Sequence, residues 1–434
     1  MTRPSISALT LLAALGTATA SAQTIAIEGG TVHTMTGAPI QGGTVLIRDG
    51  KIVAVGRNIA VPAGAQRIDA RGKIVTPGLF DSGTNIGLIE IDAVVETNDF
   101  RIGQEEDDLV AAAFNVVDGL NPNSMVIPIT RIAGVTTVVS RPQGGLIAGQ
   151  GVAIDLLGRD VEAMVIRNPV AMYGNLGESA RGALKGTRGS TTLRLREIFM
   201  DARAYARNRQ AFERGETRGY AVSRSDLEAL QPVLAGRLPL VLEAHRASDI
   251  ATALRLAREF NFRLMIYGGT EAWMVADNLA RARVPVIVQV LNNLPRTFET
   301  LGATYENAAR LRRAGVQVAI TSGETFKSFN LRQEAGNAVA YGLPHDEALR
   351  AITLVPAQLW GLEREYGSLA PGKVANVVVW GGDPLELLTP VEHVFIRGQQ
   401  IPLVSRETEL RDRYLRIDDQ TRTYQRGSQQ VPRP

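Results

Sequence analysis

The sequence of 434 residues contains no cysteine and only four histidines. Without cysteine the protein can form neither a disulfide nor a thiolate metal site, whatever the redox state of its compartment. It also lacks basic runs interleaved with aromatic residues, and its formal net charge is only +3, so we do not expect nucleic-acid binding. No fixed repeat period runs through the chain, which argues against a solenoid.

What the chain does contain is typical of an ordinary folded protein, with 45% hydrophobic and 21% charged residues. Its length suits one large barrel together with an accessory sheet. The 43 glycines are consistent with the many tight turns of a loop-rich α/β protein.

Residues 1–22 have the pattern of a secretory signal peptide. Arg3 supplies the positive end, residues 6–15 form a short apolar core, and small residues precede Gln23. The apolar core is well short of the ~20 residues that a membrane-spanning helix needs, so cleavage after Ala22 is favoured over an anchor. We therefore expect a periplasmic or secreted protein that has no membrane span after cleavage.

Residues 24–76 contain short alternating apolar runs that are typical of a small antiparallel sheet. Asp49 and Gly50 lie between two of these runs and form a strong signal for a hairpin turn. From Pro77 onward the pattern changes to strands that alternate with helices of ~10–15 residues, which indicates βαβ units around a parallel sheet. Beyond residue 130, the pattern predicts strands at residues 135–140, 240–245, 263–269, 285–289 and 316–322. It predicts helices at residues 249–260, 271–282, 331–341 and 346–353.

Two further segments have less regular patterns. Residues 143–151, QGGLIAGQG, are rich in glycine but lack the Lys-Ser/Thr of a phosphate loop, so they predict a flexible loop between a strand and a helix. Residues 190–214 place Leu193, Ile198 and Ala202 at near-helical spacing with arginines between them. This pattern predicts a solvated, amphipathic outer helix rather than an interaction motif.

Residues 76–85 read TPGLFDSGTN, a Pro-Gly turn and a short apolar run followed by small and polar residues. This segment resembles the first barrel strand of the amidohydrolase superfamily, in which Pro-Gly, an apolar run and Asp are followed by His-x-His. Residues 366–376, YGSLAPGKVAN, resemble the closing signature of the superfamily, with Asn376 in place of its Asp. Residues 243–250, EAHRASDI, and 175–179, NLGES, resemble motifs of its imidazolonepropionase-like and prolidase-like branch.

The resemblance covers residues 24–400 and implies a (β/α)₈ TIM-like barrel with a composite β-sandwich built from both chain ends. The domains implied by the resemblance and the sequence patterns are a signal peptide at 1–22, the N-terminal part of the sandwich at 23–76, the barrel at 77–362, the C-terminal part of the sandwich at 363–402 and a polar tail at 403–434.

The resemblance also places the family's metal ligands, and most of these positions carry other residues here. Family members use zinc or another divalent ion, whereas glycine offers no side-chain donor and an asparagine amide is a weak ligand for such an ion. We therefore expect no metal cofactor. The degenerate metal positions are Gly83 and Asn85 for the first histidine pair, Tyr173 for the bridging lysine, Glu243 and Gly268 for two further histidines, and Gly323 for the catalytic aspartate.

Polar residues near the expected strand ends could form a different site. A carboxylate two residues from a histidine can perform acid–base chemistry if burial tunes its pKa, although buried polar groups also persist as satisfied hydrogen-bond partners, which is the favoured interpretation. The glycines at the metal positions would hollow out the barrel mouth and leave a pocket. The catalytic candidates are Glu243, His245, Asp81 and Glu324, and the substrate-binding candidates are Arg141, Tyr173 and Lys327. Glu271 also lies at an expected strand end. The remaining histidines, His33, His345 and His393, are interpreted as surface residues.

Two functions of different class follow. The first is an exported, non-catalytic pseudoenzyme that binds a small molecule, or that forms a homo-oligomer or a complex with an active amidohydrolase relative. The second is a hydrolase of carbon–nitrogen bonds in amides, cyclic amides or dipeptide-like substrates, with an atypical site. The number of missing ligands favours the first, and the resemblance favours the second, although a fold alone does not fix a function.

Overall fold

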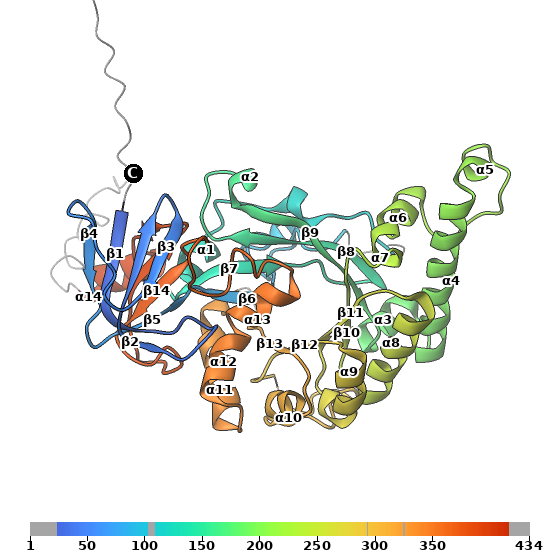
Figure 1. Cartoon of the computed structure of the whole chain (residues 1–434). Coiled ribbons are helices and arrows are strands. Elements are labelled where there is room, and N and C mark those ends of the chain that lie inside the picture. The colour runs from blue at the N-terminus through green and yellow to red at the C-terminus, as the bar shows by residue number, and fades with distance from the viewer. Residues whose placement is uncertain (1–23, 103–108, 293, 324–325, 416–434) are drawn as a thin grey trace, which may run out of the picture.

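Two sheets organise the chain, one curled into a barrel and one packed at the side of that barrel (Figure 1). The computed structural model describes residues 24–102, 109–292, 294–323 and 326–415. The predicted signal peptide and Glu324 lie outside these residues. Helices α4 and α8 cover the side of the barrel that is remote from the accessory sheet (Figure 1).

The accessory sheet is assembled from both ends of the described chain. Strand β14 pairs antiparallel with β5, which brings residues 377–380 beside residues 74–77. The strand order is β16-β15-β14-β5-β1-β2-β3, with β4 also paired to β1. The strands are β1 (Thr24–Val32), β2 (Ile40–Arg48), β3 (Lys51–Gly56), β4 (Gln66–Asp69), β5 (Ile74–Pro77), β14 (Val377–Trp380), β15 (Val391–Ile396) and β16 (Gln399–Ile401).

The local sequence explains this sheet. Asp49 and Gly50 have φ values of 51° and 76° and connect β2 to β3, as expected for a two-residue hairpin turn. Apolar residues of β1, β2, β14 and β15, among them Ile25, Ile47 and Phe395, form a core of their own. The contribution of both chain ends is therefore as predicted, while the arrangement of this domain as a sandwich stays a prediction.

The barrel sheet has eight strands within the described residues, in the order β13-β12-β11-β10-β9-β8-β7-β6. Its strands carry buried Val, Ile and Leu on consecutive positions, as is typical of parallel strands that are covered on both faces. The strands are β6 (Leu79–Thr84), β7 (Val135–Ser140), β8 (Ile147–Asp155), β9 (Val165–Asn175), β10 (Leu240–Ala244), β11 (Leu264–Gly268), β12 (Val286–Val288) and β13 (Val318–Ile320).

One barrel strand departs from the predicted (β/α)₈ pattern. Strand β8 pairs antiparallel with both β7 and β9, whereas all other pairs in this sheet are parallel within the described residues. The prediction of a flexible loop at 143–151 is therefore wrong for its second half. Glycines obscure the strand pattern there, because Gly149 has a φ of 125° and the register shifts at this point.

Side chains connect the two ends of the barrel sheet. Asp81 of β6 is wholly buried and accepts hydrogen bonds from the hydroxyl groups of Thr321 and Ser322, which follow β13. The backbone N–H of Ser322 also donates to Asp81, at 3.2 Å. These contacts, together with a 3.2 Å hydrogen bond from Thr321 to the carbonyl of Gly83, nearly close the barrel.

The predicted outer helix is present, but its buried face differs from the prediction. Leu193 is 57% exposed, whereas Leu195 is buried together with Ile198 and Ala202.

The helix predicted at 271–282 is divided into a 3-10 turn and a short α-helix. The helices around the barrel are α1 (Val126–Arg131), α2 (Val161–Met164), α3 (Glu178–Leu184), α4 (Arg188–Arg207), α5 (Arg209–Glu213), α6 (Arg224–Ala229), α7 (Gln231–Leu234), α8 (Ala247–Phe260), α9 (Ala276–Ala282), α10 (Asn307–Arg313), α11 (Leu331–Ala340), α12 (His345–Ala351) and α13 (Leu354–Leu359), and the 3-10 turns are η1 (Val95–Thr97), η2 (Val116–Gly119), η3 (Ala272–Val275) and η4 (Ser328–Asn330).

The C-terminal segment forms helix α14 (Arg406–Leu415), in which no residue is buried. Helix α14 falls within the polar tail predicted at 403–434, which stays a prediction, because residues 416–434 lie outside the described part of the chain. No helix in that described part is both long enough and apolar enough to cross a membrane.

A buried polar network joins the barrel to the accessory sheet. Asp155 at the end of β8 is fully buried and accepts hydrogen bonds from Thr137, Tyr366 and Asn376 at 2.9, 3.1 and 2.9 Å. The guanidinium of Arg397 completes the set with an ion pair of 2.6 Å. The buried charge is therefore fully compensated, as a stable interior requires.

Candidate functional site

The candidate site lies at the carboxyl ends of the barrel strands, where TIM-barrel enzymes place their catalytic groups. Arg141 directly follows β7, Tyr173 belongs to β9, and Glu243 belongs to β10. His245 directly follows β10, and Tyr267 lies near the end of β11. The structure therefore brings together four residues proposed from the sequence and adds Tyr267.

Arg141 is the centre of this group. Its side chain is only 8% exposed, and its Nη1 lies 3.3 Å from Oε2 of Glu243. The guanidinium stacks over the ring of Tyr267, with its Cζ 3.9 Å from the ring centre. Within the described residues the Nε of Arg141 and the hydroxyl of Tyr173 are buried without a hydrogen-bond partner.

Glu243 and His245 form the titratable part of the site. Nε2 of His245 lies 3.7 Å from Oε1 of Glu243, and the two side chains keep exposed fractions of 18% and 29%. Burial alone would raise the pKa of the Glu243 carboxyl, but His245 and Arg141 outweigh it and lower the pKa to about 2. Burial likewise opposes the charged form of His245, but Glu243 raises its pKa above the ordinary value. Both groups are thus stabilised in their charged forms.

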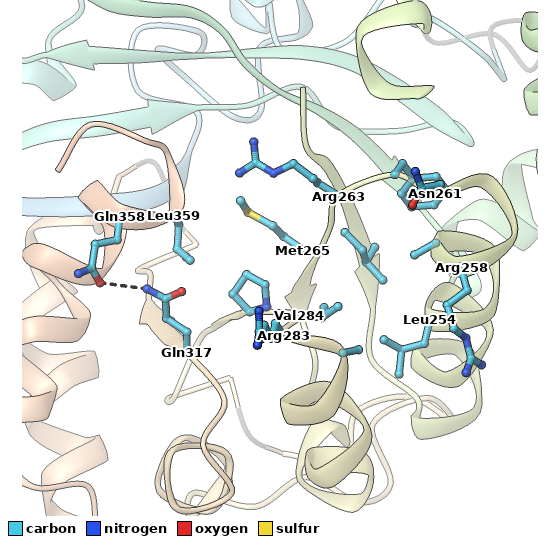
Figure 2. Close-up of a pocket in the computed structure, with 15 residues that line it drawn as sticks. Leu254, Arg258, Asn261, Arg263, Met265, Arg283, Val284, Gln317, Gln358 and Leu359 are labelled. Carbon is cyan, nitrogen blue, oxygen red and sulfur yellow. Dashed lines mark hydrogen bonds between the residues drawn. The ribbon is translucent and has the colours of Figure 1, made fainter. Parts of the chain in front are cut away.

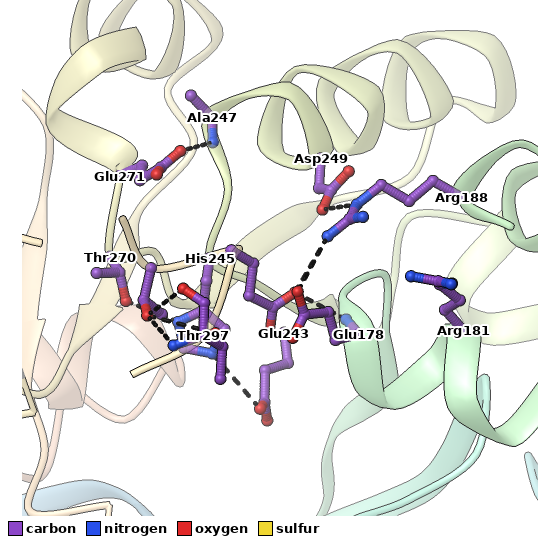
Figure 3. Close-up of polar contacts among 12 residues, drawn as sticks. Glu178, Arg181, Arg188, Glu243, His245, Ala247, Asp249, Thr270, Glu271 and Thr297 are labelled. Carbon is purple, nitrogen blue, oxygen red and sulfur yellow. Dashed lines mark hydrogen bonds and ion pairs between the residues drawn. The ribbon is translucent and has the colours of Figure 1, made fainter. Parts of the chain in front are cut away.

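A second polar layer surrounds His245 (Figure 3). Nδ1 of His245 lies 2.8 Å from the hydroxyl of Thr270, which fixes the orientation of the ring. Arg188 of α4 pairs with Asp249 at 3.0 Å and lies 3.7 Å from Glu299. Burial raises the pKa of Glu299, and the charge of His245 partly offsets this effect. The layer therefore holds a carboxyl group that ionises less readily than usual.

The residues that the resemblance places at the family's metal positions have other contacts in the described part of the chain. A Cβ on Gly83 would lie 2.5 Å from the ring of Tyr267, and a Cβ on Gly268 would lie 2.4 Å from the ring of His245. The amide of Asn85 is engaged with the carbonyl of Arg141 at 2.7 Å. Within the described residues, no group of three or more histidine, cysteine, aspartate or glutamate side chains is arranged to hold a metal ion.

The prediction that the three glycines hollow out the mouth is wrong for Gly83 and Gly268, whereas Gly323 does line a pocket. Gly83 and Gly268 accommodate the rings of Tyr267 and His245, and a Cβ on Gly323 would lie 2.1 Å from the side-chain amide of Gln289. The small residues are needed because side chains from other barrel strands and their ends fill the space. A glycine in the sequence therefore does not indicate empty volume.

The other predicted residues have separate roles. Asp81 connects β6 to β13, and burial raises its pKa. Glu271 accepts hydrogen bonds from the backbone N–H of Ala247 and of Gly302, at 2.9 and 3.0 Å, and so holds the start of α8. Lys327 lines a pocket of about 430 Å³ near the ends of β12 and β13, together with Gln289, Arg296 and Ser322.

The three remaining histidines lie away from the site. Nε2 of His345 contacts the carboxylate of Asp383 at 2.8 Å, and Nδ1 of His393 lies 3.0 Å from the amide of Gln400. His33 is half-buried, and burial lowers its pKa. These contacts are structural ones, at the accessory sheet and at helix α12.

A pocket of about 450 Å³ lies at the opposite end of the barrel strands (Figure 2). Arg263 and Met265 at the start of β11, Val284 before β12 and Gln317 before β13 line it. Gln317 donates a hydrogen bond to Gln358 at its edge. Because barrel enzymes carry their sites at the other end, we do not regard this pocket as the functional site.

Sequence patterns did not reveal Tyr267, Thr270, Arg188 or Glu299 as members of the site. Tyr267 precedes a glycine in an apolar strand, where it resembles an ordinary core residue. The signal that the sequence offers for Tyr267 is its place one residue before Gly268, which the resemblance predicts to be a degenerate metal position. Thr270 follows β11, Arg188 belongs to α4 and Glu299 lies between β12 and α10, so only the tertiary packing brings them near His245.

Comparisons with known proteins agree with this architecture. The profile of the amidohydrolase family matches residues 218–401. The solved structure of an amidohydrolase from Thermotoga maritima is 31% identical, covers 87% of this chain and 99% of its own, and has a TM-score of 0.79. A prolidase solved with N-methylphosphonate-L-proline covers 87% of this chain and 99% of its own, with 18% identity and a TM-score of 0.52, which shows the fold alone.

Two relatives extend these similarities. An imidazolonepropionase of a Polaromonas species is 26% identical and covers 82% of this chain and 86% of its own length. The amidohydrolase tasK of Hapsidospora irregularis is 24% identical over 82% of this chain, which spans only 39% of that longer protein. The fold, the family profile and the Thermotoga structure together show that the chain belongs to the amidohydrolase superfamily, in its imidazolonepropionase-like and prolidase-like branch.

Proposed function

We propose that the protein hydrolyses carbon–nitrogen bonds of small amide-like substrates at the carboxyl end of its barrel. The observation that carries this proposal is the cluster of Arg141, Glu243 and His245, which are ionisable, largely buried and located where barrel enzymes act. Membership of the amidohydrolase superfamily and the names of its relatives support the same reaction class.

The reaction requires no metal in this proposal. Water adds to the amide carbonyl carbon, the carbon–nitrogen bond breaks, and a proton passes to the leaving nitrogen. Arg141 and protonated His245 would stabilise negative charge on the carbonyl oxygen, because Glu243 keeps His245 charged. Glu299, whose pKa burial raises, is the candidate to accept the proton from water and to pass that proton to the leaving nitrogen.

The test uses the purified full chain with N-acyl amino acids, dipeptides and cyclic amides. We expect turnover that persists after dialysis against a chelator, and we expect His245→Ala to lower kcat/KM by about 10²-fold or more. His393→Ala is the matched control, because its ring lies in the accessory sheet and should leave turnover unchanged. Turnover that requires a bound divalent ion, or that survives His245→Ala, would contradict the proposed mechanism.

A second candidate is a non-catalytic, exported protein that binds a small molecule or an active relative. The observation that favours it is the filling of the family's metal positions by the side chains of Tyr267 and His245. Absence of turnover with all three substrate classes, together with co-purification of a histidine-complete relative, would support this candidate over hydrolysis. Export itself would be checked by the N-terminal residue of the secreted protein, which we predict to be Gln23.

A further inference from the structure

One residue, Arg141, is linked directly or through Tyr267 to several positions that the resemblance assigns to the metal. Its guanidinium pairs with Glu243 and stacks on Tyr267, and the ring of Tyr267 fills the space beside Gly83. Its backbone carbonyl accepts the hydrogen bond from Asn85 at 2.7 Å. The substituted positions are therefore linked to one another through this arginine.

The arrangement is that of a buried cation with its compensating partners. An isolated buried guanidinium would be costly, so it needs a carboxylate and further favourable contacts. Glu243 supplies the carboxylate, and the ring face of Tyr267 supplies a cation–π contact. The Tyr267 hydroxyl reaches the carbonyl of Gly83 at 3.4 Å, which holds the ring in place.

We infer that the Arg141 guanidinium is the fixed cation of this barrel mouth and takes the place that a divalent metal ion has in metal-binding relatives. The substitutions then form one coherent set: glycine at 83 and 268 makes room for two rings, asparagine at 85 positions the arginine backbone, and glutamate at 243 balances its charge. The inference does not depend on the proposed hydrolysis, because a fixed cation would stabilise the site with or without turnover.

The first test compares thermal unfolding of full-length variants. We expect Arg141→Met to lower Tm by at least about 4 °C, because it removes one of the two cations that balance the Glu243 carboxylate and leaves only His245. Arg141→Met combined with Glu243→Gln should recover part of that loss, since the carboxylate that lost its arginine partner is removed as well. Arg196→Met is the matched control, because Arg196 pairs with Glu259 at 2.9 Å on the surface and should change Tm little.

An unchanged Tm in Arg141→Met, or strictly additive losses in the double variant, would overturn the inference.

A second measurement uses the wild-type protein, so it does not depend on whether a variant folds. Titration of chelator-treated wild-type protein with Zn²⁺ or Mn²⁺ should show no saturable heat and no rise in Tm. One equivalent of tightly bound ion, weakened by Glu243→Gln, would show that a metal rather than Arg141 is the cation of the site. Because these readouts are stability and metal binding, they separate this inference from the turnover assays.

Discussion

Three side chains set the charge of the barrel mouth. Arg141 and His245 are positive and Glu243 is negative, and each ionised form is stabilised by its neighbours rather than by water. Glu243 is the shared partner, at 3.3 Å from Arg141 and 3.7 Å from His245. Loss of this one carboxylate therefore affects both cations.

This coupling predicts how stability depends on pH. The pKa of Glu243 falls from 4.5 to about 2 on folding, so its contribution is present above about pH 4.5 and is lost as the pH falls toward 2. The pKa of His245 is raised above 6.5, so its contribution is complete below that pH and is lost as the pH rises through the folded-state pKa. Both contributions are complete only between about pH 4.5 and 6.5.

We expect Glu243→Gln to flatten the pH profile of the free energy of unfolding on both sides of that window, as measured by urea denaturation. Glu259→Gln, at a surface ion pair, serves as the control and should leave the shape of the profile unchanged. If the Glu243→Gln profile ran parallel to the wild-type profile, the pair would not be coupled as described.

At this site, the sequence allowed a prediction only for residues that are close together along the chain. Glu243 and His245 are two residues apart around one strand end, so their proximity could be predicted. Tyr267 and Gly83 are 184 positions apart, and their contact depends on how the barrel curves. The filling of the glycine positions could therefore not be predicted from either segment alone.

Strands β6 and β11 pack across the barrel interior through Gly83 and Tyr267. We expect Gly83→Ala to lower the free energy of unfolding by about 1–3 kcal/mol, because the added methyl group overlaps the tyrosine ring. Gly37→Ala is the control, since a Cβ there would meet nothing within 4 Å. Urea denaturation measures both, and equal effects of the two changes would contradict the packing described.

Elements with consistent local signals were predicted well. The hairpin at Asp49 and Gly50 and the β-branched strand β7 follow directly from residue preferences. Strand β8 was missed because its glycines interrupt the alternation that identifies a strand. In α4, Leu195 rather than Leu193 faces the core, because tertiary packing determines the buried face of an arginine-rich helix.

The Asp155 network joins the barrel to the accessory sheet. Asn376 is central to it, because its amide nitrogen donates to Asp155 at 2.9 Å while its amide oxygen accepts from the backbone of Arg397 at 2.8 Å. The amide supplies a donor and an acceptor at once. An ionised carboxylate at this position could only accept.

We therefore expect Asn376→Asp to lower the free energy of unfolding by at least about 3 kcal/mol at neutral pH, because two buried carboxylates would face each other. Mildly acidic buffer should restore part of the loss, since a protonated carboxyl can donate again. Asn123→Asp, at an exposed position, is the control for added charge. Urea denaturation at the two pH values provides the measurement, and a loss that is independent of pH would argue against carboxylate repulsion.

The contacts that close the barrel have a consequence for how the protein folds. Asp81 and Thr321 are separated by 240 positions, so the first and last barrel strands meet only after the intervening chain has been synthesised. Contacts of such long sequence separation form slowly, because loop-closure entropy opposes them. We therefore expect the contacts between the Asp81 carboxyl and its hydroxyl partners to be among the last to form as the barrel folds.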